Sequence, residues 1–357
     1  MQPPRYSLQT IASYPPTPAM QHAREIVLRY GSGSFCCRIL QAGFEYWFSR
    51  KTCAVIGYKK RGRYLVCGGE PACSQKEYRE VLFEFELWAR RQGLEVIYFG
   101  VEKAEARPHH RYSSIVLGAE PIWEPSYWNA CMEQSAGLRK QLRRATNKGI
   151  AIVEIAAGAA TARDSMRRTL ARWVASRAMP PLGFLADVRP PFVADEQQVI
   201  LAGLQHGQMV AYITACPIPQ VRGYLIDQIV RTPDAPNGTS ELLIDAMMCR
   251  LHRLGTQFVS LGLVALSTNA PKAPMEASWL GMAQRLARRF GSQWYNFAGL
   301  EAFRSRLRPQ RWEPLYMIFS RRLTGWEAAY GAASAFFDLP LWKMACNTIT
   351  NRRIFKC

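Results

Sequence analysis

The sequence predicts an α/β protein made of two domains of related plan. Its 357 residues exceed one small domain, because ~150 residues is a usual domain size. Helix-like and strand-like segments alternate along the chain, which favours mixed sheets covered by helices. A hydrophobic fraction of 48% with 20% charged residues is typical of a globular chain with a core. That composition excludes a disordered or collagen-like chain.

The first half of the chain carries two expected helices and four expected strands. A threonine N-cap followed by proline starts one helix at Pro18, and Gly31 ends it. Ser74–Glu77 matches a capping box for a second helix, which ends at Gly93. β-Branched and aromatic residues between turns predict strands near residues 44–49, 53–59, 62–68 and 94–100.

The second half repeats the theme. Helices are expected over 135–148, 164–177, 239–254 and 277–290, the second capped by Asp164 and the third by Thr239 or Ser240. Strands are expected over 150–155, 208–216, 223–230 and 256–262. The expected division is an N-terminal arm and helix (1–34), two domains (35–134 and 135–324) and an aromatic and basic tail (325–357).

Charge limits the partners. Lys and Arg number 46 against 27 Asp and Glu, a formal net charge of +19. A protein this basic is expected to meet a polyanion, either nucleic acid or an anionic membrane surface. The sequence has no apolar run long enough to span a bilayer and no secretory signal pattern, so a cytoplasmic protein is expected. The ten scattered cysteines include no Cys-x-x-Cys pair and predict reduced core thiols, with no metal site.

One short helix concentrates this charge. Between Leu138 and Gly149, five cations surround a narrow apolar stripe, and no acidic residue interleaves to pair with them. They are Arg139, Lys140, Arg143, Arg144 and Lys148. A charge run is often only a solvated helix face, but this one favours contact with phosphates.

A second segment places acids where chemistry is plausible. Asp227 lies on a strand that leads through a Pro/Asn/Gly turn to Glu241, in the first turn of a helix. Two carboxylates in such positions suit acid–base work. Glu241 is equally well placed to complement the helix dipole, which is the structural alternative.

A third segment, residues 290–316, interleaves aromatic residues with arginines. Trp294, Tyr295, Asn296 and Trp312 accompany Arg304 and Arg306. This composition suits phosphate contact with stacking on bases. The alternative is aromatic residues in the core and arginines reaching outward.

Four ordered segments together resemble one family. Residues 138–149, 235–241, 261–267 and 294–314 are similar to the C-terminal catalytic domain of the lysylphosphatidylglycerol synthases, or multiple peptide resistance factors, in a free-standing form. The resemblance implies two tandem acetyltransferase-like (GNAT) domains. It implies transfer of an aminoacyl group from aminoacyl-tRNA to a lipid hydroxyl, typically of phosphatidylglycerol, without a cofactor. The partners implied are aminoacyl-tRNA and the anionic inner face of the membrane.

Within that resemblance, Asp227 and Glu241 are candidates to hold the α-amino group or assist the nucleophile. Arg231, Arg304 and Arg306 are candidates to bind lipid phosphate or the tRNA end. The expected substrate-binding residues are Arg139, Lys140, Arg143, Arg144, Lys148, Asn237, Trp294, Tyr295, Asn296 and Trp312. A cleft between the two domains is expected to receive Asp227, Arg231, Glu241 and Arg304.

The sequence departs from the family pattern in places. Val230 stands where the family's Asp-x-x-Arg motif has arginine, and Leu315 where Trp-x-Pro-Arg-Tyr has it. These departures keep a non-catalytic RNA- or membrane-binding protein on a degenerate GNAT fold as an alternative. A CoA-dependent N-acyltransferase is a second alternative, although its Gln/Arg-x-x-Gly-x-Gly/Ala loop is not found. A peptidoglycan-precursor or sterol acceptor is a third.

The tail has two interpretations. Trp326 and Tyr330 begin a series of aromatic residues that ends in Arg352, Arg353 and Lys356. Such a segment suits docking on an anionic leaflet. It suits a helix packed on the second domain equally well.

Overall fold

The computed structural model describes residues 17–102, 111–156, 159–176, 197–270 and 297–336. Its strands are β1 (Glu45–Phe48), β2 (Val55–Arg61), β3 (Tyr64–Gly68), β4 (Glu95–Val101), β5 (Tyr112–Trp123), β6 (Ile150–Glu154), β7 (Val199–Gln205), β8 (Gln208–Ile218), β9 (Gly223–Arg231), β10 (Phe258–Ser260), β11 (Val264–Ala265) and β12 (Arg311–Ser320). Its α-helices are α1 (Pro18–Tyr30), α2 (Tyr78–Arg91), α3 (Trp128–Glu133), α4 (Ala136–Asn147), α5 (Ala160–Ala175), α6 (Thr239–Arg253), α8 (Phe297–Arg306) and α9 (Gly325–Phe336). Short 3₁₀ turns include η2 (Arg38–Leu40) and η6 (Pro219–Val221).

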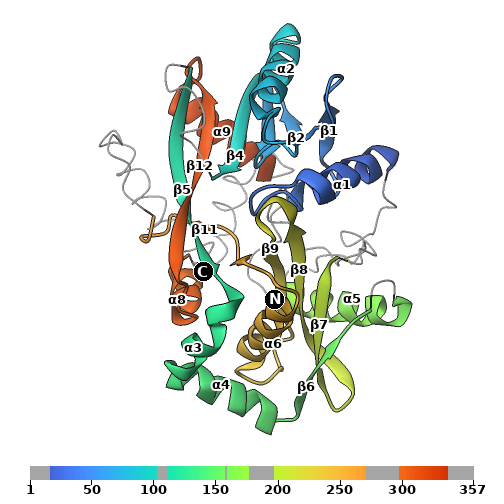
Figure 1. Cartoon of the computed structure of the whole chain (residues 1–357). Helices are drawn as coiled ribbons and strands as arrows, with labels where there is room; N and C mark the ends of the chain where they lie inside the picture. Colours follow the sequence, from blue (N-terminus) through green and yellow to red (C-terminus); the bar gives the residue numbers. More distant parts are fainter. Residues whose placement is uncertain (1–16, 103–110, 157–158, 177–196, 271–296, 337–357) are drawn as a thin grey trace, which may run out of the picture.

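All of these strands belong to one mixed sheet, so the predicted α/β class is confirmed. The strand order is β1-β2-β3-β4-β12-β5-β10-β9-β8-β7-β6, and β11 pairs with β5 beside this path. Figure 1 shows the sheet running the length of the molecule, with α2 near one end and α4 near the other.

The two halves of the sheet follow the same plan. β1, β2 and β3 pair antiparallel, α2 crosses over, and β4 then pairs parallel to β3. β7, β8 and β9 likewise pair antiparallel, α6 crosses over, and β10 pairs parallel to β9. A parallel neighbour requires such a crossover, which a helix usually supplies.

Each half is then completed by a strand from the other half of the chain. β12, late in the sequence, pairs antiparallel with β4, whereas β5, from the first half, pairs antiparallel with β10. β5 and β12 also pair with each other along their length. They form the long two-stranded ribbon seen along one side of Figure 1. The two halves are therefore continuous through the sheet. A domain boundary at residue 134 would assign the paired strands β5 and β10 to different domains.

Helices cover the sheet through separate apolar clusters. α2 buries Val81, Leu82 and Phe85 on one face of the first half. α9 packs Ala328 and Ala332 with α1 and η2 in another cluster. In the second half α6 and α5 lie on opposite faces, since Ile213 of β8 packs with α6 residues and its neighbour Tyr212 packs with α5 residues.

Most predicted elements appear, and the differences concern their ends. Thr17 caps α1 as predicted, its side chain accepting from the Met20 N–H at 3.2 Å. The capping box at Ser74 is wrong, because α2 begins at Tyr78 with no side-chain cap. Asp164 lies inside α5 rather than at its start, and Gly238 rather than Thr239 or Ser240 caps α6. The helix expected over 277–290 lies outside the described residues.

The beginning of the tail is part of the fold. α9 packs against β2, β3 and β4 of the first half rather than on the second domain. Gly331 lies so close to Ile97 and Tyr64 that an added Cβ would come within 2.6 Å of Ile97. Residues 337–357, with the remaining aromatic and basic residues of the tail, lie outside the described residues.

Candidate active site

A pocket of about 380 Å³ opens in the second half between α4, the β9–α6 turn and α8. Its lining brings together five residues predicted from the sequence, Arg144, Arg231, Asn237, Glu241 and Arg306. Gln141, Gly238, Ser240 and Phe303 complete it. We call it the arginine pocket.

The turn between β9 and α6 is what holds the pocket together. Gly238 has φ +93°, a left-handed conformation that suits glycine, and it caps α6. A Cβ built on Gly238 would lie 2.1 Å from the backbone oxygen of Gln141. The absence of a side chain therefore lets α4 contact the start of α6. Because Arg144 lies one turn after Gln141 on α4, this contact carries its side chain to the pocket.

The pocket suits an anion. Three arginines and one carboxylate among its lining residues leave a formal charge of +2. The Arg231 guanidinium also donates to the Pro236 carbonyl at 3.3 Å, which fixes it beside the turn. The Arg306 guanidinium lies over the Phe303 ring, 6.0 Å from its centroid. The first N–H groups of α6 add partial positive charge, since a helix leaves them without an intrahelical partner.

The other cations of α4 fall into two groups, one bonded within the protein and one exposed. Arg139 folds back and donates to the carbonyl of Met132 at 2.6 Å and to that of Glu133, so it closes the end of α3. Lys140, Arg143 and Lys148 are exposed. Arg144 is exposed too, and among these cations it is the one that also lines the arginine pocket.

Asp227 is not among the lining residues of the arginine pocket. It lies at a β-bulge of β9, and its carboxylate pairs with the Arg38 guanidinium of η2 at 3.1 Å. Both side chains are largely buried, with 13% and 17% exposed. Burial, and then the charge of Asp227, raises the pKa of Tyr212 on the face of the sheet that α5 covers. The bulge therefore directs Asp227 to different neighbours from Arg231 and Glu241.

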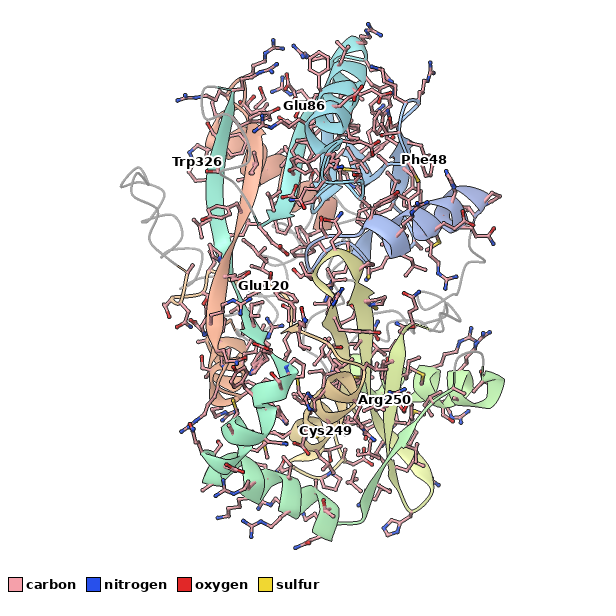
Figure 2. The ribbon with its side chains drawn as sticks, viewed as in Figure 1. Phe48, Glu86, Glu120, Cys249, Arg250 and Trp326 are labelled. Atoms are coloured by element: carbon pink, nitrogen blue, oxygen red, sulfur yellow. The ribbon has the colours of Figure 1, made fainter. Side chains whose placement is uncertain are left out.

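Arg304 is also placed elsewhere. It donates to the Gly262 carbonyl at 2.5 Å, near a group of buried carboxyls that the sequence alone did not reveal. Glu120 is fully buried on β5 and accepts from the Ser260 hydroxyl at 2.5 Å. Figure 2 shows Glu120 between the two halves of the sheet. The available signal was a single acid within the otherwise apolar segment around it.

These buried carboxyls bind protons more tightly than usual. Burial raises the pKa of Glu120 to about 7, and nearby Glu313 adds to the effect. Burial and the charge of Glu120 raise the pKa of Glu102 to about 8. The Ser34 N–H donates to Glu102 at 3.0 Å. Both carboxyls therefore keep their protons to a higher pH than an exposed glutamate does.

The remaining predicted binding residues do not line the arginine pocket. Trp312 lies on β12 opposite Pro121 of β5. Trp294, Tyr295 and Asn296 lie outside the described residues. Within the part of the chain that the structure describes, no group of three or more His, Cys, Asp or Glu residues could hold a metal ion.

Comparison with known proteins identifies the family. The family described as "Phosphatidylglycerol lysyltransferase, C-terminal" matches residues 24–319. The chain belongs to this family. A phosphatidylglycerol lysyltransferase of Bacillus subtilis is 22% identical over 280 residues, which are 78% of this chain and 32% of that protein. The chain spans about a third of the length of this curated relative.

Solved structures agree on the fold. The C-terminal domain of a putative lysylphosphatidylglycerol synthetase from Agrobacterium fabrum superposes with a TM-score of 0.73 at 20% identity, covering 89% of this chain and 95% of that one. L-PGS from Bacillus licheniformis gives a TM-score of 0.73 at 18% identity, covering 91% of this chain and 97% of that one. Among the described residues, no helix is both long and apolar enough to cross a membrane.

Proposed function

We propose that this protein transfers an aminoacyl group from aminoacyl-tRNA to a hydroxyl of phosphatidylglycerol. The family and the names of its relatives point to phosphatidylglycerol as the acceptor. The observation that carries the proposal is the arginine pocket, where three arginines and the start of α6 meet around one carboxylate. Both substrates carry phosphodiesters, which arginine forks recognise well.

The reaction is an ester exchange. The lipid hydroxyl oxygen attacks the carbonyl carbon of the aminoacyl ester, the bond from that carbon to the terminal ribose oxygen breaks, and the hydroxyl proton ends on the ribose. The aminoacyl ester is already activated, so ATP is not needed. The protein's task is to hold the two reactants together and to assist the proton transfer.

In this proposal the residues of the arginine pocket divide the work. Arg231 and Arg306 bind a substrate phosphate, and Arg144 links the pocket to the exposed cations of α4. Glu241 is the carboxylate in the pocket that accepts the hydroxyl proton or holds the α-amino group. Asp227 acts by positioning, because its carboxylate is held by Arg38 rather than presented to the pocket.

The exposed face of α4 is the proposed tRNA surface. Lys140, Arg143 and Lys148 are exposed on α4 or directly after it, and Arg144 leads from them to the pocket. A row of cations fits the regular spacing of backbone phosphates. This arrangement would guide the acceptor end of the tRNA toward Glu241.

We also propose that the two halves of the sheet are two acetyltransferase-like units that have exchanged a strand. The repeated order of three antiparallel strands, a crossover helix and a parallel strand supports this division. The boundary near residue 134 would then separate the two units in sequence but not in the sheet. We propose further that the protein works at the cytoplasmic face of the membrane, where its lipid acceptor lies.

The test is a transfer assay with purified protein, tRNA charged with radiolabelled amino acid, and vesicles that contain phosphatidylglycerol. We expect label in the organic phase that depends on both tRNA and phosphatidylglycerol. No organic-soluble label with any charged tRNA would contradict the proposal. Label transferred instead from acetyl-CoA to an amine would identify a CoA-dependent N-acyltransferase.

A further inference from the structure

A second pocket lies at the opposite end of the molecule from α4. It has a volume of about 320 Å³ and lies where the end of α2, the start of β5 and the end of β12 meet. Its lining includes four arginines, Arg90, Arg111, Arg321 and Arg322, together with Glu86 and Glu95. In Figure 2, Glu86 marks this end of the molecule, and in Figure 1 α4 lies at the other.

Three of the four arginines of this second pocket are not paired with a carboxylate of the described residues. Arg90, Arg111 and Arg322 form no ion pair among the described residues. Glu86 forms no ion pair with these arginines among the described residues, and its carboxylate accepts from two tyrosine hydroxyls. Tyr112 donates to its two oxygens at 2.7 and 2.8 Å, and Tyr98 donates at 3.1 Å. Four arginines against two glutamates leave the lining at a formal charge of +2.

A tight turn fixes two of these arginines in place. The Arg321 N–H donates to the Arg111 carbonyl at 3.1 Å, and the Leu323 N–H donates to the Ser320 carbonyl at 2.9 Å. The Arg322 N–H donates to the Ser320 hydroxyl at 3.3 Å. The turn therefore presents its arginines from a held backbone rather than from a loose loop, which lowers the entropy lost on binding an anion.

The same turn leads directly into α9, which exposes aromatic residues. Trp326 is 66% exposed and Tyr330, one helical turn later, is 55% exposed. The opposite side of α9 is buried through Ala328 and Ala332. Tryptophan and tyrosine at the level of lipid headgroups are the usual anchors of proteins at a membrane surface. Figure 2 shows Trp326 near the same end as Glu86.

We propose that this end of the protein docks on the bilayer and that the second pocket receives the phosphate of an anionic phospholipid headgroup. A bilayer fits better than RNA, because the arginines surround one compact pocket with an aromatic fringe rather than forming a track for a backbone. The choice of phosphatidylglycerol as probe rests on the proposed function. Docking itself is independent of the transfer reaction.

The test compares two double variants of the full chain in vesicle co-sedimentation, with no tRNA present. The test variant is Arg90→Gln with Arg322→Gln. The control is Arg79→Gln with Arg50→Gln, which removes the same charge at exposed sites that do not line the pocket. Arg79 lies eleven residues before Arg90 on α2, about 16 Å along the helix axis.

We expect the test variant to bind vesicles of phosphatidylcholine with phosphatidylglycerol at least tenfold more weakly than the control, because each arginine near an anionic surface contributes about fivefold. Binding to pure phosphatidylcholine should be weak for both. Trp326→Ala should also weaken docking, because it removes an exposed aromatic anchor.

Three results would overturn the proposal. The first is equal vesicle binding by the test and control variants. The second is a loss of tRNA affinity in the test variant with vesicle binding retained, which would assign this surface to RNA. The third is that millimolar inorganic phosphate releases wild type, the control variant and the test variant from vesicles equally well. That result would show that binding depends on diffuse surface charge and not on the second pocket. Transfer activity is not read in this experiment, so its outcome is separate from that of the proposed reaction.

Discussion

Replacing Gly238 by alanine should destabilise the protein through two separable effects. At φ +93° an L-residue is strained by about 1–2 kcal/mol. The new Cβ would also lie 2.1 Å from the Gln141 backbone oxygen, so α4 must move, and overpacking of this kind costs ~1–3 kcal/mol. The expected loss in the free energy of unfolding is therefore ~2–5 kcal/mol.

Gly149 offers a matched control for the strain alone. It has φ +80°, but a Cβ there would meet nothing within 4 Å. Gly149→Ala should therefore cost only the ~1–2 kcal/mol of backbone strain. Urea unfolding followed by circular dichroism measures both variants, and their denaturant slopes should match. If the two variants lose the same stability within ~0.5 kcal/mol, the contact between α4 and α6 does not hold the pocket as described.

Three further predictions concern charge. The pKa values of Glu120 (about 7) and Glu102 (about 8) are raised above the ordinary value of 4.5. Between these values the folded state keeps protons that the unfolded state releases. The free energy of unfolding should therefore fall as pH rises from about 4.5 to 8. Glu120→Gln should flatten that fall in melting temperature, and an equally steep fall would refute the assignment. Asp227→Ala should cost ~3 kcal/mol by removing the carboxylate that pairs with the largely buried Arg38 guanidinium, and adding Arg38→Met should restore part of that loss in a double-mutant cycle. Arg143→Glu should lower the salt dependence of tRNA binding by ~0.9 in log–log slope per lost duplex contact, and an unchanged slope would show that α4 faces another partner.

Local sequence patterns predicted most helices and strands of the described chain. Apolar periodicity placed α6 and β9, and an N-cap followed by proline placed the start of α1. The exchange of β5 and β12 was not predicted, since pairing between strands almost two hundred residues apart leaves no local pattern. The continuous sheet follows from that exchange.

The sequence predicted those site residues that lie close together along the chain, but not those whose placement depends on distant strands or on a bulge. Arg231 and Glu241 flank one turn, so their closeness follows from the sequence. Asp227 is only four residues from Arg231, but a β-bulge redirects its side chain, and bulges have no reliable sequence signature. Glu120 was missed because its raised pKa comes from burial, which depends on distant strands.

The most direct test of the central claim is the transfer assay repeated with variants of the arginine pocket. Arg231→Gln and Arg306→Gln each remove a hydrogen bond to a charged group, worth ~1.5–3 kcal/mol, so each should lower transfer by about 10–150-fold. Arg253→Gln, an exposed change at the far end of α6, should leave transfer within about twofold of wild type, because surface substitutions rarely exceed ~0.5 kcal/mol. Full transfer by both pocket variants, with melting temperatures unchanged, would contradict the assignment of this pocket to the reaction.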